Sequence, residues 1–264
     1  MRHRVTFVWF SYSVDSFLFE QSFRAATETT KRDDRIEAEF VLADDIWNPV
    51  EDGVKSRFLA KENTRIFETT YRRTNMLLGG ENLEGQVLAM KRAKDETKSD
   101  IIVKVDCDTL IYQSDWLVKL AESKTADITG VFDFGFNCHF SIYGFTYAIK
   151  SRIIDDLVKD VKKYPAHHHA WEDHEISSRI FRLRNGELDF AIRYLEGPQS
   201  GFIVRRLMDV NNTFVNSQAC TFAWDYQTSR DKISYRKAVC DWMHHLNDIR
   251  EGISPPFEVP KTIP

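Results

Sequence analysis

The sequence predicts an α/β protein in which helices flank a mostly parallel central sheet, with a smaller antiparallel portion in the second half of the chain. Within residues 5–110, apolar runs typical of buried strands alternate with segments whose apolar residues recur at helical spacing. Within residues 127–150, Phe, Tyr, Val and Ile dominate between glycines, which indicates antiparallel strands. A chain of 264 residues with 42% hydrophobic content can bury a sizeable core.

The first half is expected to alternate strands and helices. The expected elements are a strand over 5–14, a helix over 17–29, a strand from 37 that ends at Asp44 and Asp45, a possible strand near 65–71, a helix over 82–98 and a strand over 101–106. An apolar stripe at Phe19, Phe23 and Ala26 indicates the first helix. The second should begin with Asn82 as its amino-terminal cap, and Lys98 suits its carboxyl end.

The second half should contain the antiparallel strands, several helices and a less regular carboxyl third. The expected helices run over 151–164, before Pro165, and from about 171 to a stop at Gly186, with a third near 233–249. Glu172 and Asp173 fall in the first turn of the second of these, where the helix dipole stabilises acidic side chains. We expect one domain over residues 1–264 that ends in a Pro-rich tail at 251–264.

Charge and cysteine content narrow the classes of function. The formal net charge is −4 and the sequence pI is about 6.1, so the chain lacks the basic footprint of nucleic-acid binding. Its four cysteines are widely spaced, which predicts reduced thiols and a cytoplasmic protein. The amino terminus imitates a signal peptide, but its apolar run is short and broken by Ser and Tyr, so a first core strand is expected instead. No transmembrane segment is expected, and peripheral contact with a membrane stays open.

Four aspartates follow the expected strands at the points where those strands end. They are Asp44, Asp45, Asp106 and Asp108. Ligands of parallel sheets gather outside the carboxyl ends of the strands, so these acids should meet at one edge. Residues two apart on a strand point to the same side, and the mutual repulsion of Asp106 and Asp108 would be offset by a cation. Carboxylates suit Mg²⁺ or Mn²⁺ with phosphate as a further ligand; the alternative is a solvated pair of acids.

The order of these motifs resembles that of nucleotide-sugar-dependent glycosyltransferases of the GT-A fold, which carry a D-x-D motif after a strand. FVLADDIW (40–47) is similar to the family's second strand, NLEGQVLAMKRAKDETKSDIIVKVDCD (82–108) to the helix and strand that lead to its D-x-D motif, and AWEDHEI (170–176) to the acidic motif at a helix start in inverting members. The resemblance covers most of residues 5–185 and rests on order and spacing. It implies a GT-A-like fold with a nucleotide-binding half over about 1–110 and an acceptor half over about 111–250.

The resemblance also implies ligands and chemistry. The donor would be a UDP- or GDP-sugar, the acceptor a hydroxyl of a glycan or another molecule, and the cofactor Mn²⁺ or Mg²⁺. Asp106 and Asp108 would hold the cation, with His244 as a third ligand. Asp173 would act as the general base of an inverting transfer, with Glu172 in reserve.

Further residues are expected to contact the two substrates. The resemblance implies that Asp44 or Asp45 contacts the nucleoside, and Asp106 is a candidate contact to the donor as well as to the metal ion. Arg72, Arg73 and Lys104 are cationic candidates for the pyrophosphate, with surface ion pairs as the ordinary alternative. Tyr143 or Tyr147 offers a ring for an acceptor sugar, with a place in the core as the alternative.

Four other functions compete with this hypothesis. A retaining glycosyltransferase would share the fold and the metal ion. A phosphatase of the haloacid dehalogenase type uses D-x-D-x-T, whereas here Thr109 comes one position too early. A nucleotidyltransferase would need a Gly-rich first loop, and residues 9–17 contain no glycine. A catalytically silent module that binds glycans is the alternative outside enzymes.

Overall fold

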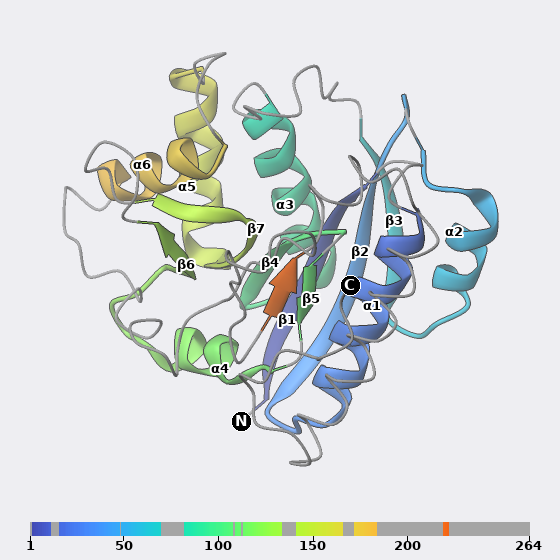
Figure 1. Ribbon diagram of the computed structural model, residues 1–264. Helices are drawn as coiled ribbons and strands as arrows, with labels where there is room; N and C mark the ends of the chain where they lie inside the picture. The colour runs from blue at the N-terminus through green and yellow to red at the C-terminus, as the bar shows by residue number, and fades with distance from the viewer. Residues whose placement is uncertain are drawn as a thin grey trace, which may run out of the picture.

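A six-stranded sheet forms the centre of the protein (Figure 1). The structure is a computed structural model that describes residues 2–11, 16–47, 49–69, 82–107, 109–111, 113–133, 141–165, 172–183 and 219–221. The order of the strands in the sheet is β3-β2-β1-β4-β7-β6. The strands are β1 (His3–Ser11), β2 (Ile36–Asp45), β3 (Thr64–Thr69), β4 (Ile101–Asp106), β6 (Ile128–Asp133) and β7 (Ser141–Lys150).

In the main sheet, the strands of the first half of the chain are parallel and those of the second half antiparallel, as the sequence predicts. Strands β1 to β4 are mutually parallel, β7 pairs antiparallel with β4, and β6 pairs antiparallel with β7. The antiparallel portion therefore extends the main sheet. Two short strands, β5 (Thr109–Ile111) and β8 (Ala219–Thr221), form a second, antiparallel sheet. The predicted fold class is confirmed.

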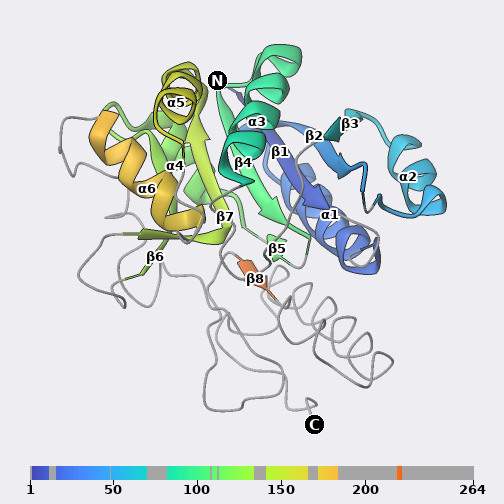
Figure 2. The ribbon, with the colours of Figure 1, turned by 90° about the horizontal axis from the view of Figure 1, so that it is seen from above.

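Helices cover both faces of the main sheet, and Figure 2 shows α1 and α3 on opposite sides of it. One buried cluster joins the sheet to α1 (Ser16–Lys31), α2 (Asp52–Leu59) and α4 (Asp115–Glu122). The other joins it to α3 (Leu83–Thr97), α5 (Ser151–Lys163) and α6 (Glu172–Leu183). Within the described ranges, no helix is both long enough and apolar enough to span a membrane.

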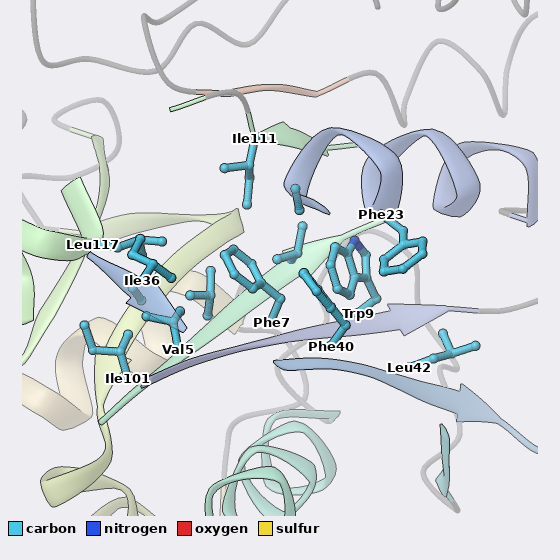
Figure 3. Close-up of a cluster of buried hydrophobic side chains, with 14 of the residues drawn as sticks. Val5, Phe7, Trp9, Phe23, Ile36, Phe40, Leu42, Ile101, Ile111 and Leu117 are labelled. Atoms are coloured by element: carbon cyan, nitrogen blue, oxygen red, sulfur yellow. The ribbon is translucent and has the colours of Figure 1, made fainter. Parts of the chain in front are cut away.

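The core under α1 is aromatic. Alternate residues of β1 point to this face, so Phe7 and Trp9 lie on the same side of the sheet. Figure 3 shows them beside Phe23 of α1 and Phe40 of β2, and the rings of Phe23 and Phe40 meet edge-on with centroids 5.3 Å apart. The Trp9 indole donates from Nε1 to Ser22 Oγ at 2.8 Å, so its burial leaves no unsatisfied donor. The first strand is therefore part of the core, as the sequence predicts.

The sequence does not predict two of the helices, and the prediction that Asn82 caps a helix is wrong. Both α2 and α4 have eight residues, which is too short for a clear apolar repeat. Helix α3 does follow Asn82, but the side chain of that residue makes no capping hydrogen bond. Its backbone is already helical, with φ −93° and ψ −5°, whereas a capping residue needs an extended backbone. The predicted helix near 233–249, the stop at Gly186 and the tail lie outside the described residues.

The turn between α1 and β2 is tied to α4 through Asp33. Asp33 accepts hydrogen bonds from Arg35 Nε and Nη2, both at 2.8 Å, and from Ser114 Oγ at 2.5 Å. The hydrogen bonds from Arg35 lower the pKa of Asp33 to about 2, with help from Ser114 and against the opposing effect of burial. The Asp33 carboxylate is thus held in its charged form by its native neighbours.

Replacing Asp33 by Asn should reduce the dependence of stability on acidic pH. The unfolded chain binds a proton at Asp33 near pH 3.8 and the folded chain only near pH 2, so the stability that this group contributes is complete above pH 3.8 and falls as the pH drops toward 2. The stability gap between the native chain and Asp33→Asn should therefore be about 1 kcal/mol smaller at pH 3 than at pH 7. Urea unfolding at both pH values measures it. Asp34→Asn, an exposed change in the same turn, is the control, and an equal gap at both pH values would contradict the assignment.

Candidate active site at the carboxyl edge of the sheet

Two parallel strands, β2 and β4, which lie on either side of β1, bring acidic residues to one edge of the sheet (Figure 1). Phe10 of β1 pairs with Ala43 of β2 on one side and with Asp106 of β4 on the other. Asp45 therefore ends β2 two residues beyond the row that contains Asp106. Two strand spacings separate these strands, which is roughly 10 Å. Asp44, Asp45 and Asp106 thus lie at strand carboxyl ends on one edge.

Asp44 and Asp45 point to opposite faces and have different partners. Both residues are 4% exposed. Asp44 accepts hydrogen bonds from the Val50 backbone N–H at 2.8 Å and from Lys55 Nζ at 3.1 Å. Burial works to lower the pKa of Lys55, but the hydrogen bond and charge of Asp44 raise it above its usual value. Both oxygens of Asp44 therefore serve to hold α2 and the loop before it.

Asp45 lies on the face of the sheet that α3 covers. Ala43, two residues before it, packs in the buried cluster that contains α3, and residues two apart on a strand point to the same face. Its Oδ1 accepts from the Trp47 backbone N–H at 3.0 Å. In the described part of the chain, its Oδ2 has no hydrogen-bond donor. Asp106 follows Ile102 on the same face by the same alternation, so Asp45 and Asp106, but not Asp44, share one side of the sheet.

Asp106 is joined to the start of α6 through a buried lysine. Lys104 Nζ lies 2.6 Å from Asp106 Oδ1 and 3.6 Å from Glu172 Oε2. Glu172 also accepts from the Tyr147 hydroxyl at 2.9 Å. The Gln86 amide lies against the same carboxylate, and hydrogen bonding there requires the orientation that turns its nitrogen toward Glu172 Oε1, at 2.6 Å. Side chains of α3, β4, β7 and α6 therefore meet at one point, where the acids and the lysine offset each other's charge.

Two predicted contacts to substrates are wrong. Lys104 is 2% exposed and paired with two acids, so it is not a surface cation available to a pyrophosphate. Tyr147 is fully buried, so its ring offers no face to an acceptor sugar. In both cases the core of the sheet takes the side chain, which for Tyr147 is the alternative that its apolar strand indicated.

Several predicted site residues lie outside the described part of the structure. Arg72, Asp108 and His244 belong to undescribed segments. Asp173 belongs to the first turn of α6, but its side chain is not among those described, and the same holds for Tyr143 on β7. Their predicted roles stay predictions.

The described residues alone do not compose an ion site. No three His, Cys, Asp or Glu side chains within the described ranges are grouped as ligands of one metal ion. Asp106 presents one carboxylate oxygen beyond the one held by Lys104, and 30% of its side chain is exposed. A hard cation at this edge would therefore need Asp106 together with ligands from the undescribed segments.

The contacts of Glu172 with Lys104, Tyr147 and Gln86 are not predicted from the sequence, although the sequence contains one sign of a buried ion pair. Lys104 is the single charge within IIVKV, a run in which every residue is buried. A charged residue inside such a strand needs a buried partner of opposite charge. That partner comes from α6, far along the chain, and no pattern around Gln86 or Tyr147 indicates that either residue contacts Glu172.

No protein-family model matches the chain, and no curated protein is similar to it. Solved structures do resemble it. A glycosyltransferase involved in glycosylation of the major capsid of PBCV-1 has a TM-score of 0.50 at 8% identity, covering 91% of this chain and 98% of that one. The apo form of glycosyltransferase GlyE from Streptococcus pneumoniae TIGR4 has a TM-score of 0.50 at 11% identity, covering 97% and 65%. Galactosyltransferase LgtC with donor and acceptor sugar analogues has a TM-score of 0.49 at 12% identity, covering 97% and 98%.

These likenesses concern the fold, because the identities are far too low to carry a function. The first two structures are glycosyltransferases of the GT-A type, and their similarity extends over nearly the whole of this chain. The chain has the fold of the GT-A glycosyltransferases.

Proposed function

We propose that the protein is a metal-dependent glycosyltransferase that moves a sugar from a UDP- or GDP-sugar to an acceptor hydroxyl. One observation carries the proposal: in a GT-A-type fold, β2 and β4 bring Asp45 and Asp106 to the same face of the carboxyl edge, beside the first residue of α6. Ligands of parallel sheets bind at this edge. The acids at the ends of β2 and β4 would serve the donor, and the start of α6 would serve the acceptor.

Donor binding is assigned to the strand ends. Asp45 is favoured over Asp44 for the nucleoside, because Asp44 already binds Val50 and Lys55 with both oxygens. A carboxylate such as Asp45 Oδ2 accepts hydrogen bonds from ribose hydroxyls or from N–H groups of a base. Arg72 is proposed for the pyrophosphate on its charge and its place after β3.

Asp106, Asp108 and His244 are proposed to hold Mn²⁺ or Mg²⁺. A bound divalent cation would neutralise charge on the leaving diphosphate. The protein's own part is to orient the carboxylates: β4 fixes the backbone of Asp106, and Lys104 fixes one of its oxygens. The ligand set is oxygen-rich, as these hard cations prefer.

Asp173 is proposed as the general base that takes the proton of the acceptor hydroxyl. The amino terminus of α6 favours an ionised carboxylate at this position. Glu172 is less suited, because Tyr147, Gln86 and Lys104 already engage its oxygens. A base of this kind implies inversion, which NMR of the anomeric configuration of the product tests; a retained configuration would favour the retaining alternative and remove Asp173 from this role.

A thermal-shift screen tests donor class and metal dependence together. UDP or GDP with Mn²⁺ should raise the Tm by several degrees, because a ligand that binds only the native state stabilises it. Either component alone should have a much smaller effect, and EDTA should abolish the shift. ADP with Mn²⁺ is the control for non-specific phosphate binding. Stabilisation by neither UDP nor GDP in the presence of Mn²⁺ would contradict the proposal, and stabilisation by glycans alone would favour the silent binding module.

A further inference from the structure

Lys104 is an unusual residue for the middle of a buried strand in a central sheet. It is 2% exposed, and the residues on either side of it on β4, Val103 and Val105, are fully buried. An ammonium group removed from water in this way is costly unless acids compensate it. Here the compensation comes from two carboxylates that belong to different parts of the candidate site.

The contacts of Lys104 join β4, which carries the proposed metal ligand Asp106, to α6, which carries the proposed base. Its Nζ lies 2.6 Å from Asp106 Oδ1, a short, charge-assisted hydrogen bond. The same Nζ lies 3.6 Å from Glu172 Oε2 and 5.9 Å from the centre of the Tyr147 ring. Tyr147 and Gln86 donate to the other side of Glu172, so that carboxylate is fixed from several directions.

We propose that Lys104 is a built-in cation of the candidate site, and that it keeps the affinity for a free divalent ion low until the donor's diphosphate arrives. This inference rests on the proposed function, since it assumes that Asp106 faces the metal ion and the donor. The positive charge of Lys104 repels a second cation, and its hydrogen bond occupies one oxygen of Asp106. The diphosphate brings negative charge that offsets this repulsion, so the ion binds together with the nucleotide sugar.

Lys104 is also a positioning residue for the acceptor side. Because Glu172 is the first residue of α6, holding its carboxylate fixes the start of the helix and with it the backbone of Asp173. The same ammonium sets the orientation of Asp106. Lys104, together with Tyr147 and Gln86, therefore helps to fix the position of the start of α6 relative to Asp106.

The test compares Mn²⁺ binding by the native protein and by Lys104→Met, which keeps the length of the side chain and removes the charge. Free Mn²⁺ is measured by electron paramagnetic resonance, without nucleotide and then with UDP or GDP. Lys104→Met should bind Mn²⁺ alone about tenfold more tightly, because one nearby positive charge has been removed. Added nucleotide should improve Mn²⁺ binding more in the native protein than in the variant.

Lys150→Met is the matched control. Lys150 is another buried lysine of the sheet, but it pairs in register with Ile101 at the opposite end of β4 and donates to the carbonyl groups of Ala121 and Ser123. Its substitution should lower stability and leave Mn²⁺ affinity unchanged. A purely structural role for Lys104 would give this same result in Lys104→Met, and that outcome would overturn the inference.

The outcomes also separate this inference from the proposed function. If the native protein binds no Mn²⁺ with or without UDP or GDP while Lys104→Met does, the repulsion of a free ion by Lys104 is supported, whereas its relief by the diphosphate and the proposed function both fail. If neither protein binds Mn²⁺, both fail. If the native protein binds Mn²⁺ with nucleotide and Lys104→Met is no tighter for Mn²⁺ alone, only the role of Lys104 is overturned.

A second variant covers the case in which Lys104→Met does not fold. Glu172→Gln removes one of the two negative charges that lie near Lys104, so Mn²⁺ affinity should fall, by about tenfold on the same Coulomb argument. An unchanged or higher Mn²⁺ affinity in Glu172→Gln would overturn the inference.

Discussion

Asp106→Asn should lower kcat/KM for glycosyl transfer by about 100- to 1000-fold, the loss expected when one preorganised electrostatic contact to a transition state is removed. The amide has no charge with which to hold a cation, and it leaves Lys104 without the carboxylate that lies 2.6 Å away. In the proposed reaction, both effects would act at the point where charge develops on the leaving diphosphate. Steady-state kinetics with the donor identified by the thermal-shift screen measures the loss.

Asp100→Asn is the control for Asp106→Asn. Asp100 precedes the same strand at its other end, is exposed, and accepts from the Arg4 backbone N–H at 3.0 Å. Its substitution should leave kcat/KM within about twofold, as a surface change far from the chemistry usually does. Full turnover by Asp106→Asn would contradict the proposed site and favour a metal-independent reaction.

Asp160→Ala should destabilise the protein by about 3 kcal/mol, the loss expected when one partner of a buried ion pair is removed. Asp160 on α5 accepts from Arg179 Nη1 at 2.8 Å and from Arg182 Nη2 at 2.5 Å, both on α6. Arg179 is 2% exposed and, among the described residues, would keep Glu175 of its own helix as the one acid paired with its buried charge. Urea unfolding followed by fluorescence measures the change.

Asp156→Ala provides the matched control on the same helix. Asp156 is exposed and pairs with Lys159 at the surface, so its loss should cost less than about 0.5 kcal/mol. Equal effects of Asp156→Ala and Asp160→Ala would contradict the structural role of the buried pair. Because the pair holds the helix that begins with Glu172, Asp160→Ala should also disturb the site at its amino end.

The elements that the sequence predicts best have one strong periodic signal. The apolar stripe of α1 and the shared face of Ile176, Ile180 and Leu183 on α6 are found as expected, because side-chain spacing on a helix is a local property. Helices of eight residues, such as α2 and α4, offer too few turns for the same signal. Asn82 fails as a cap because capping depends on a backbone conformation that residue type does not fix.

The candidate site likewise has features that the sequence predicts and features that only the tertiary structure decides. The sequence predicts that acids gather at the ends of strands. The strands, their parallel direction in an alternating α/β pattern and the positions of Asp45 and Asp106 can all be inferred from the pattern of residues along the chain. Two contacts could not be predicted in this way: Asp44 anchors α2, and Lys104 pairs with Asp106 and Glu172. Both depend on which residues from distant segments approach each face of the sheet. Burial and charge pairing arise from such long-range packing, and a linear pattern does not record them.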